Sequence, residues 1–142
     1  MQASKALFGN KRGSAAVEVG IMLPWLVFTF IATLDFGFCA SSLIATQNAA
    51  RIVAMYAAAS SANLANVATV KCGYAADALK YAPTPVTGCG TALSVTTSSN
   101  TTFSAFTEVQ VTVTYTVTLL AIPGIMPGSL AISKSVTLPV RS

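Results

Sequence analysis

The residues best suited to chemistry lie near the N-terminus, in the stretch Lys11-Arg12-Gly13-Ser14-Ala15-Ala16-Val17-Glu18-Val19. Gly13 ends a basic leader, and Glu18 follows five residues later at the start of an apolar run. Because glycine has no side chain, the backbone at Gly13 can lie extended in a protease cleft. Cleavage after Gly13 would expose the α-amino group of Ser14, a cation that could pair with Glu18 of a neighbouring subunit within a membrane.

The position of Glu18 needs a reason, because a carboxylate inside a membrane span costs about 2.5 kcal/mol or more and normally has a partner. Pairing with the Ser14 amine would supply that partner and would fix the axial stagger between neighbouring helices. The alternative is that Glu18 lies at the level of the lipid headgroups, where its charge favours the positive end of the helix dipole.

A long N-terminal helix must position these residues. Residues 19–34 carry no charge, and the apolar-rich stretch of residues 15–40 is long enough to cross about 30 Å of hydrocarbon at about 1.5 Å per residue. Pro24 lies inside this span, removes one backbone hydrogen bond and should bend the helix. The basic cluster precedes the span and no basic residue follows before Arg51, which predicts a cytoplasmic N-terminus and an exported remainder. A buried helix of a soluble protein is the alternative.

The helix should continue well beyond the span, since the alanine-rich sequence after residue 40 contains no Pro or Gly until residue 73. We expect it to end near residue 60. The predicted organisation is therefore a cytoplasmic leader at 1–13, a helix at 14–60 that is transmembrane in its first half, and a periplasmic α+β domain at 61–142.

The C-terminal part shows the two-residue alternation of strands, most clearly where Val, Tyr and Leu alternate with Gln and Thr over residues 109–119. Three strands are predicted, at 92–97, 109–119 and 130–140. Residues 60–70 predict a turn or frayed helix end, residues 73–81 a short helix, and residues 122–128 a loop. Lys134 is in phase with apolar residues, which requires a bulge or an edge position there. We expect an α+β fold in which the long helix packs against a small antiparallel sheet.

Two of the three cysteines bracket the start of this domain. If Cys72 and Cys89 lie in an oxidising compartment, we expect them to form a disulfide that stabilises the domain by roughly 3 kcal/mol. Two unrelated buried thiols are the alternative, and a zinc site lacks further ligands. Cys39 is the odd cysteine, for which we favour a free helix thiol over an intermolecular disulfide, and its surroundings are a poor match to a lipoprotein site.

The composition limits the possible functions. Of the 142 residues, 54% are apolar and only 8% are charged, which is unusual for a freely soluble domain. The net charge is +4, but three of the eight basic residues lie in the first thirteen positions, so the basicity belongs to a targeting segment and we expect no nucleic-acid partner. The chain has no histidine and only four acidic residues. We therefore expect no enzyme, no metal and no cofactor.

The N-terminal features resemble those of the TadE family of the type IV pilin superfamily. The resemblance covers the first sixty residues and rests on the basic leader, Gly13, Glu18, Leu23-Pro24, Asp35-Phe36-Gly37 and the helical residues 47–51 and 55–58. The Val- and Thr-rich strands match the family more loosely. The family usually carries Phe or Tyr directly after the glutamate, whereas this chain has Val19.

The resemblance implies a minor pilin or pseudopilin that acts in the assembly or adhesion of a tight-adherence (Tad) pilus. In this family a membrane-bound prepilin peptidase cuts after the glycine, so the implied partners are the membrane, this peptidase, other pilin subunits and the Tad assembly platform. The implied location is the bacterial inner membrane, with one span, a periplasmic C-terminal domain and possible incorporation into an extracellular pilus.

Three other functions remain open on the sequence. The first is an unprocessed single-span envelope protein that presents a small periplasmic scaffold domain. The second is an exported enzyme that uses Cys or Ser–Lys chemistry. The third is a secreted protein released by signal peptidase, for which no Ala-x-Ala site directly follows the apolar run.

Overall fold

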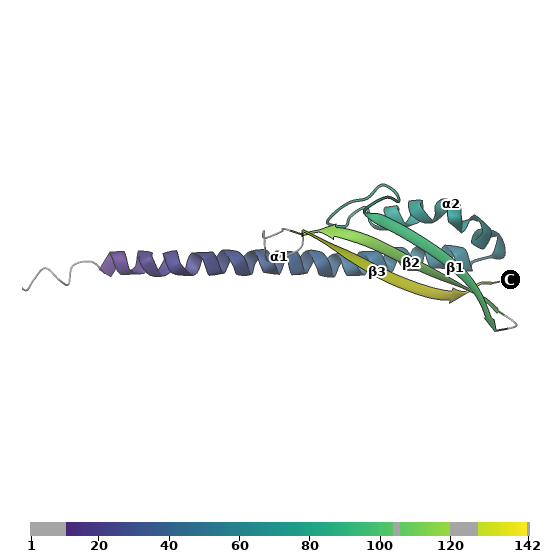
Figure 1. Ribbon diagram of the computed structural model, residues 1–142, viewed down its shortest axis with the longest axis horizontal. Helices are drawn as coiled ribbons and strands as arrows, with labels where there is room; N and C mark the ends of the chain where they lie inside the picture. Colours follow the sequence, from purple (N-terminus) through teal and green to yellow (C-terminus); the bar gives the residue numbers. More distant parts are fainter. Residues whose placement is uncertain (1–10, 104–105, 120–127, 142) are drawn as a thin grey trace, which may run out of the picture. The chain divides into compact units, whose positions relative to one another are not determined.

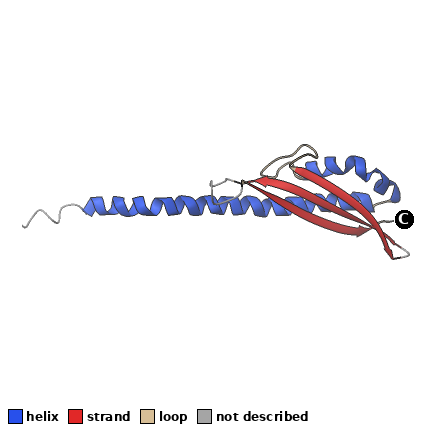
Figure 2. Ribbon diagram, in the orientation of Figure 1, coloured by secondary structure: helices blue, strands red, loops and turns tan. Residues whose placement is uncertain are grey.

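The structure, a computed structural model, describes residues 11–103, 106–119 and 128–141, except for the side chains of residues 11–15, 101–103 and 106. Two helices are followed by three strands: α1 Lys11–Ala58, α2 Ser61–Ala78, β1 Leu93–Phe103, β2 Phe106–Thr118 and β3 Ser129–Pro139 (Figures 1 and 2). The chain divides into two compact units, Met1–Asp35 and Phe36–Ser142. The predicted α+β class is confirmed, because the long apolar helix packs against a three-stranded antiparallel sheet.

Helix α1 is a single element of 48 residues that continues through Pro24. It ends at Ala58, close to the predicted position near residue 60. The alanine-rich sequence of its second half has high helix propensity. The carbonyl of Ala58 at the helix end accepts a hydrogen bond from the Arg141 N–H at 2.9 Å, so a terminal helical carbonyl is satisfied by the end of the chain.

The second helix begins earlier than the sequence predicts. Residues 60–70 do not form a turn, because α2 is continuous over Ser61–Ala78. Ser60 has an extended backbone, and its Oγ accepts a hydrogen bond from the Asn63 N–H at 3.1 Å. The prediction is wrong because Ser60 acts as an N-cap residue, which satisfies an unpaired donor of the first turn and stabilises the helix.

The sheet has the order β1-β2-β3, with β2 in the centre. The predicted alternation in β2 is confirmed, since its inward side chains are fully buried and comprise Val109, Val111, Val113, Tyr115 and Val117. The first strand is longer than predicted and extends to Phe103. Most of the predicted loop at 122–128 lies outside the described residues.

Strand β3 lies at the edge of the sheet, which explains Lys134. The register between β2 and β3 is continuous and pairs Lys134 with Val113. The sequence left open a bulge or an edge position, and the edge position is the one found. A lysine that points inward at an edge can still reach water, and it discourages pairing with further strands.

The core of the second unit forms between the inner face of the sheet and both helices. Helix α1 contributes small residues that are fully buried, namely Ala49, Ala50, Val53, Ala54 and Ala57. Such short side chains allow the helix backbone to approach the sheet closely. Tyr56 of α1 and Tyr74 of α2 stack with ring centroids 5.0 Å apart, which adds a contact between the two helices.

A buried tyrosine secures the connection between α2 and β1. The Tyr115 side chain is fully buried, and its hydroxyl donates a hydrogen bond to the Thr84 carbonyl at 2.6 Å. The same oxygen accepts a hydrogen bond from the Thr84 N–H at 3.1 Å. The loop therefore has both of its backbone polar groups at Thr84 paired inside the domain.

Candidate functional site

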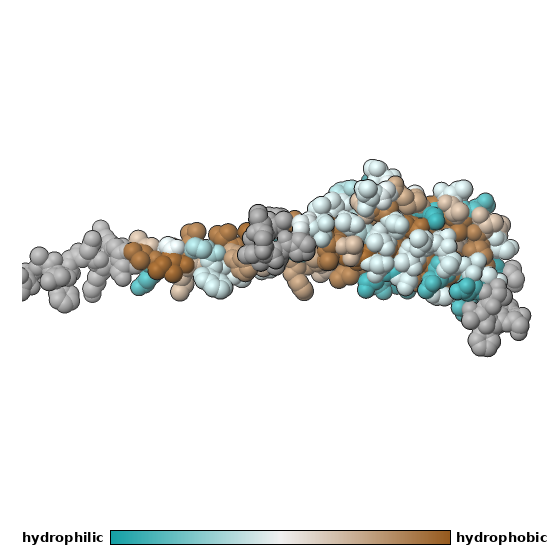
Figure 3. Space-filling model, in the orientation of Figure 1, coloured by the Kyte–Doolittle hydropathy of each residue, from teal (hydrophilic) through white to brown (hydrophobic). Residues whose placement is uncertain are grey.

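The first candidate feature is the exposed apolar surface of α1 in the first unit. Residues 16–30 are all exposed, and the exposed fractions reach 73% at Trp25 and 69% at Ile21. Among the described residues, α1 from Ala16 onward is the one helix long and apolar enough to cross a membrane, with a window of mean hydropathy 1.9 that is not buried by the protein. Figure 3 shows hydrophobic side chains along this helix. The helix and the disulfide described below suggest a membrane-anchored envelope protein.

The hydroxyl groups of two threonines in this segment are satisfied within the helix. The Thr29 hydroxyl donates a hydrogen bond to the Trp25 carbonyl at 2.8 Å, and the Thr33 hydroxyl donates to the Thr29 carbonyl at 2.8 Å. Unpaired donors are costly in hydrocarbon, where water is absent. These two threonines are therefore compatible with a lipid environment, although the sequence alone gives no signal of their rotamers.

Pro24 lies beside an apolar notch on the same helix. The notch has a volume of about 270 Å³ and is lined by Pro24, Trp25 and Phe28. The Trp25 and Phe28 rings meet edge to face with centroids 6.5 Å apart. Since every lining side chain is apolar, the notch can accept a lipid chain or an apolar side chain of another helix, but no polar ligand.

Gly13, Ser14 and Glu18 occupy the first two turns of α1. The backbone at Gly13 and Ser14 is helical, and the Glu18 side chain is exposed. Residues four apart lie on the same helix face one turn apart. After a cut at Gly13, Glu18 would thus lie one turn from the Ser14 amine of its own chain. The cut itself and this pairing stay predictions.

A second apolar surface lies on the outer face of α1 in the second unit. It consists of large exposed side chains, with exposed fractions from 39% to 77%: Phe36, Leu43, Ile44, Ile52 and Met55. The opposite face of the helix is buried and includes Ser42 and Thr46. The Thr46 hydroxyl donates to the Ser42 carbonyl at 2.7 Å, so a polar group on the buried face is paired locally.

The predicted disulfide is present in the structure. Cys72 of α2 and Cys89, which precedes β1, are bonded with their Cα atoms 5.3 Å apart. The bond closes the same connection that Tyr115 holds at Thr84. Cys39 has no disulfide partner within this chain and is of intermediate exposure on α1, and the preference for a free thiol over an intermolecular disulfide stays a prediction. Among the described residues, no three His, Cys, Asp or Glu side chains gather to hold a metal.

We expect Cys72→Ser to lower the free energy of unfolding of the second unit by roughly 3 kcal/mol, because the unfolded chain loses a cross-link. Cys39→Ser is the matched control and should change it by less than about 0.5 kcal/mol. The measurement is chemical denaturation of the full chain followed by circular dichroism. Labelling of both Cys72 and Cys89 by a thiol reagent without reductant would contradict the disulfide.

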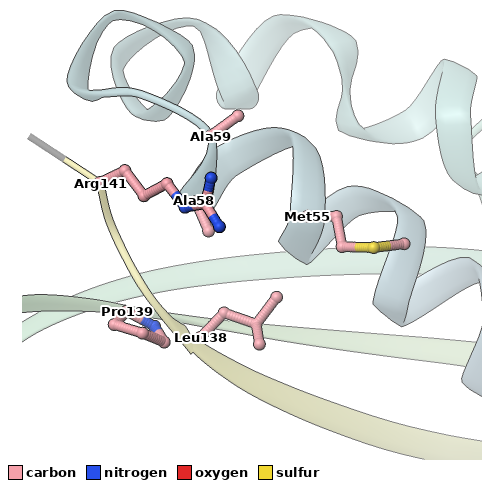
Figure 4. Close-up of a pocket in the computed structure, with 6 residues that line it drawn as sticks. All are labelled: Met55, Ala58, Ala59, Leu138, Pro139 and Arg141. Atoms are coloured by element: carbon pink, nitrogen blue, oxygen red, sulfur yellow. The ribbon is translucent and has the colours of Figure 1, made fainter.

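Two tertiary contacts of the second unit could not be predicted from the sequence. A groove of about 360 Å³ between the end of α1 and β3 (Figure 4) depends on Met55 and Leu138 meeting from distant parts of the chain. Its other lining residues are Ala58, Ala59, Pro139 and Arg141. The hydrogen bonds between Tyr115 and Thr84 also join residues 31 positions apart. Such contacts leave no local periodicity or spacing to read.

Comparison of the chain with protein-family models, with curated proteins and with solved structures found no match. The architecture itself is pilin-like. It consists of a long N-terminal apolar helix followed by a small antiparallel three-stranded sheet.

Proposed function

We propose that this chain is a minor pilin-like subunit of a Tad-type pilus, anchored by α1 and cut after Gly13 by a prepilin peptidase. The observation that carries the proposal is the apolar surface of α1, which extends over more residues than a bilayer can cover. Exposed large apolar side chains occur from Val17 to Met55. A surface of this kind suits packing of α1 against similar helices of other subunits.

The length of the helix supports this proposal. Residues 16–58 form 43 helical residues, about twice the roughly 20 residues that cross a bilayer. Hydrocarbon covers only about 30 Å. The apolar outer face around Ile44 and Met55 is therefore not buried in lipid. Contiguous exposed apolar surface usually marks an interaction site. Helices of other pilin subunits would pack on this face and bury it.

The proposed role of Glu18 follows from its place at the start of the apolar segment. A carboxylate there is costly unless it has a cationic partner. Cleavage after Gly13 creates such a cation at Ser14 in every processed subunit. The pairing would set the register between neighbouring helices and make assembly depend on processing.

The proposal gives the chain no catalytic role and no cofactor. Its partners would be the inner membrane, the prepilin peptidase, other pilin subunits and the assembly platform. The second unit, with its disulfide between Cys72 and Cys89, would lie in the periplasm and enter the pilus with the helix. The alternative is an unprocessed envelope scaffold protein, which the fractionation experiment would distinguish from a processed subunit.

The test is fractionation of the native envelope with an antibody against the second unit. We expect the cut chain in sheared pili or together with the assembly platform, and we expect deletion of the peptidase to leave the chain uncut in the membrane. The control is an unrelated single-span membrane protein from the same cells. A chain that stays uncut and solely in the membrane fraction of wild-type cells would contradict the proposal.

A further inference from the structure

A small polar pocket lies on the outer face of the sheet. It has a volume of about 160 Å³ and is lined by Asn100, Glu108, Gln110 and Thr137. The strand register explains why these residues meet, because Glu108 of β2 pairs with Asn100 of β1 and Gln110 of β2 pairs with Thr137 of β3. All four residues are exposed. The pocket therefore opens away from the core of the second unit.

The outer face around this pocket carries hydroxyl groups in place of charges. Side chains of β2 that alternate with its buried valines point outward, together with their register partners on β1 and β3. Two successive rows across the three strands consist of hydroxyl side chains, namely Thr96-Thr112-Ser135 and Ser94-Thr114-Ser133. At the outward positions of the described strands, Glu108 is the one charged residue. The face thus offers many neutral polar groups and a single carboxylate.

Three other classes of ligand fit the pocket poorly. Calcium takes about six to eight oxygen ligands, whereas the lining side chains offer at most five, two from Glu108 and one from each of the other three residues. An anion would be repelled by the Glu108 carboxylate. A protein segment usually binds through an apolar or aromatic anchor in a buried pocket, and all four lining side chains are polar.

The hydrogen-bonding groups instead match a ligand with several neighbouring hydroxyl groups, each of which can donate and accept. The Glu108 carboxylate accepts hydrogen bonds, and those from hydroxyl groups are short and strong because the acceptor is charged. The Ser98 hydroxyl donates to Gln110 Oε1 at 3.5 Å, so the amide N–H groups are what Gln110 presents to a ligand. The Thr137 hydroxyl can do both. Donors and acceptors therefore lie side by side, as a vicinal diol requires.

We propose that this pocket binds one sugar unit of a neutral glycan through its hydroxyl groups. The volume supports a single unit, because sites for drug-sized molecules measure about 300 Å³ or more. Adjacent units of the glycan would lie on the rows of Thr and Ser, where sugar hydroxyls replace water without the cost of burying a charge. The inference goes beyond the proposed function, since it requires neither a cut after Gly13 nor packing of α1 against other subunits.

The experiment measures glycan binding by the full chain in phosphatidylcholine nanodiscs, which avoid detergents with sugar headgroups. One arm uses an immobilised array of neutral and acidic glycans, and the other uses peptidoglycan sacculi purified from the same cells. Both arms contain EDTA. We expect retention on neutral glycans of the array, which would indicate an external surface, or on the sacculi, which would indicate the cell's own wall.

Matched variants test whether the pocket carries this binding. Glu108→Gln preserves the size of the side chain and should weaken binding about tenfold, as expected for the loss of hydrogen bonds to a charged group. Thr137→Val removes one neutral hydroxyl and should weaken it about threefold. Thr114→Val is the control, because its hydroxyl lies outside the pocket and pairs with Ser133 at 3.0 Å. This control should bind within about twofold of the wild type.

Four results would overturn the proposal: no retention in either arm, a preference for acidic glycans, binding that appears only when calcium replaces EDTA, or unchanged binding of Glu108→Gln. Circular dichroism of each variant shows that it is folded before binding is compared. Leader removal and pilus fractionation are measured separately in the native envelope, so failure of the glycan proposal leaves the result for the proposed function intact.

Discussion

Replacing Gly13 with tryptophan is expected to abolish leader removal while the chain still inserts into the membrane. Gly13 lies in the first turn of α1, so a protease must unwind this turn before the backbone can lie extended in its cleft. Glycine lowers the cost, because it is about 1 kcal/mol less favourable than alanine in a helix. A large side chain would both favour the helix and collide with the cleft.

The measurement for Gly13 is the N-terminal sequence of the membrane-extracted chain. Gly20→Ala serves as the control, because a methyl group there would meet nothing within 4 Å and the residue lies outside the cut. This control should be processed as the wild type is. An N-terminus at Ser14 in the Gly13→Trp chain would show that the cut does not require glycine and would contradict this prediction.

Glu18→Ala is expected to yield a chain that is cut but does not assemble. The carboxylate lies beyond the cut, so the peptidase can still act, but the new Ser14 amine loses its partner. An uncompensated charge in a low-dielectric setting costs about 3 kcal/mol, and we therefore expect about 100-fold less chain in sheared pili. Glu18→Asp should be partly defective, because the shorter side chain keeps the charge but misplaces it.

Asp77→Ala is the matched control for Glu18→Ala. It removes the same charge from an exposed position on α2 and should leave assembly unchanged. The readout is the ratio of mature chain in pili to mature chain in the membrane. Wild-type levels of Glu18→Ala in the pilus fraction would mean that the glutamate only interacts with the helix dipole at the membrane surface.

The long helix and the central strand could be predicted because their signals are local. An uncharged run such as residues 19–34 needs an apolar environment wherever it lies in the chain. The alternation from Val109 to Val117 puts one side-chain set on the buried face of a strand. The strand prediction holds because burial of the apolar set outweighs competing local preferences.

The end of β1 was predicted too early because another part of the chain decides it. Residues 98–102 are polar and carry no strand pattern, but the backbone pairs with β2 through Ser99 and Asn100, which extends β1 beyond the predicted end. The start of α2 was missed although its signal is local, since Ser60 is an N-cap residue that accepts a hydrogen bond from Asn63. For Lys134, the strand order decided between the two predicted alternatives, a bulge and an edge position.

The candidate site divides in the same way. Gly13 and Glu18 could be found because their proposed chemistry depends on spacing along one helix. The groove at Met55 and Arg141 could not, because its walls come from residues more than eighty positions apart. The disulfide between Cys72 and Cys89 lies between these cases, since the cysteine count suggested a pair but only the fold brings the two residues together.

The central claim is that the chain is a processed pilin-like subunit. Its most direct test is the intact mass of the chain purified from sheared pili, measured with and without reductant. We expect a chain that begins at Ser14 and gains two hydrogens on reduction, from the one disulfide. A chain that retains residues 1–13 in the native envelope and is missing from the pilus fraction would contradict it.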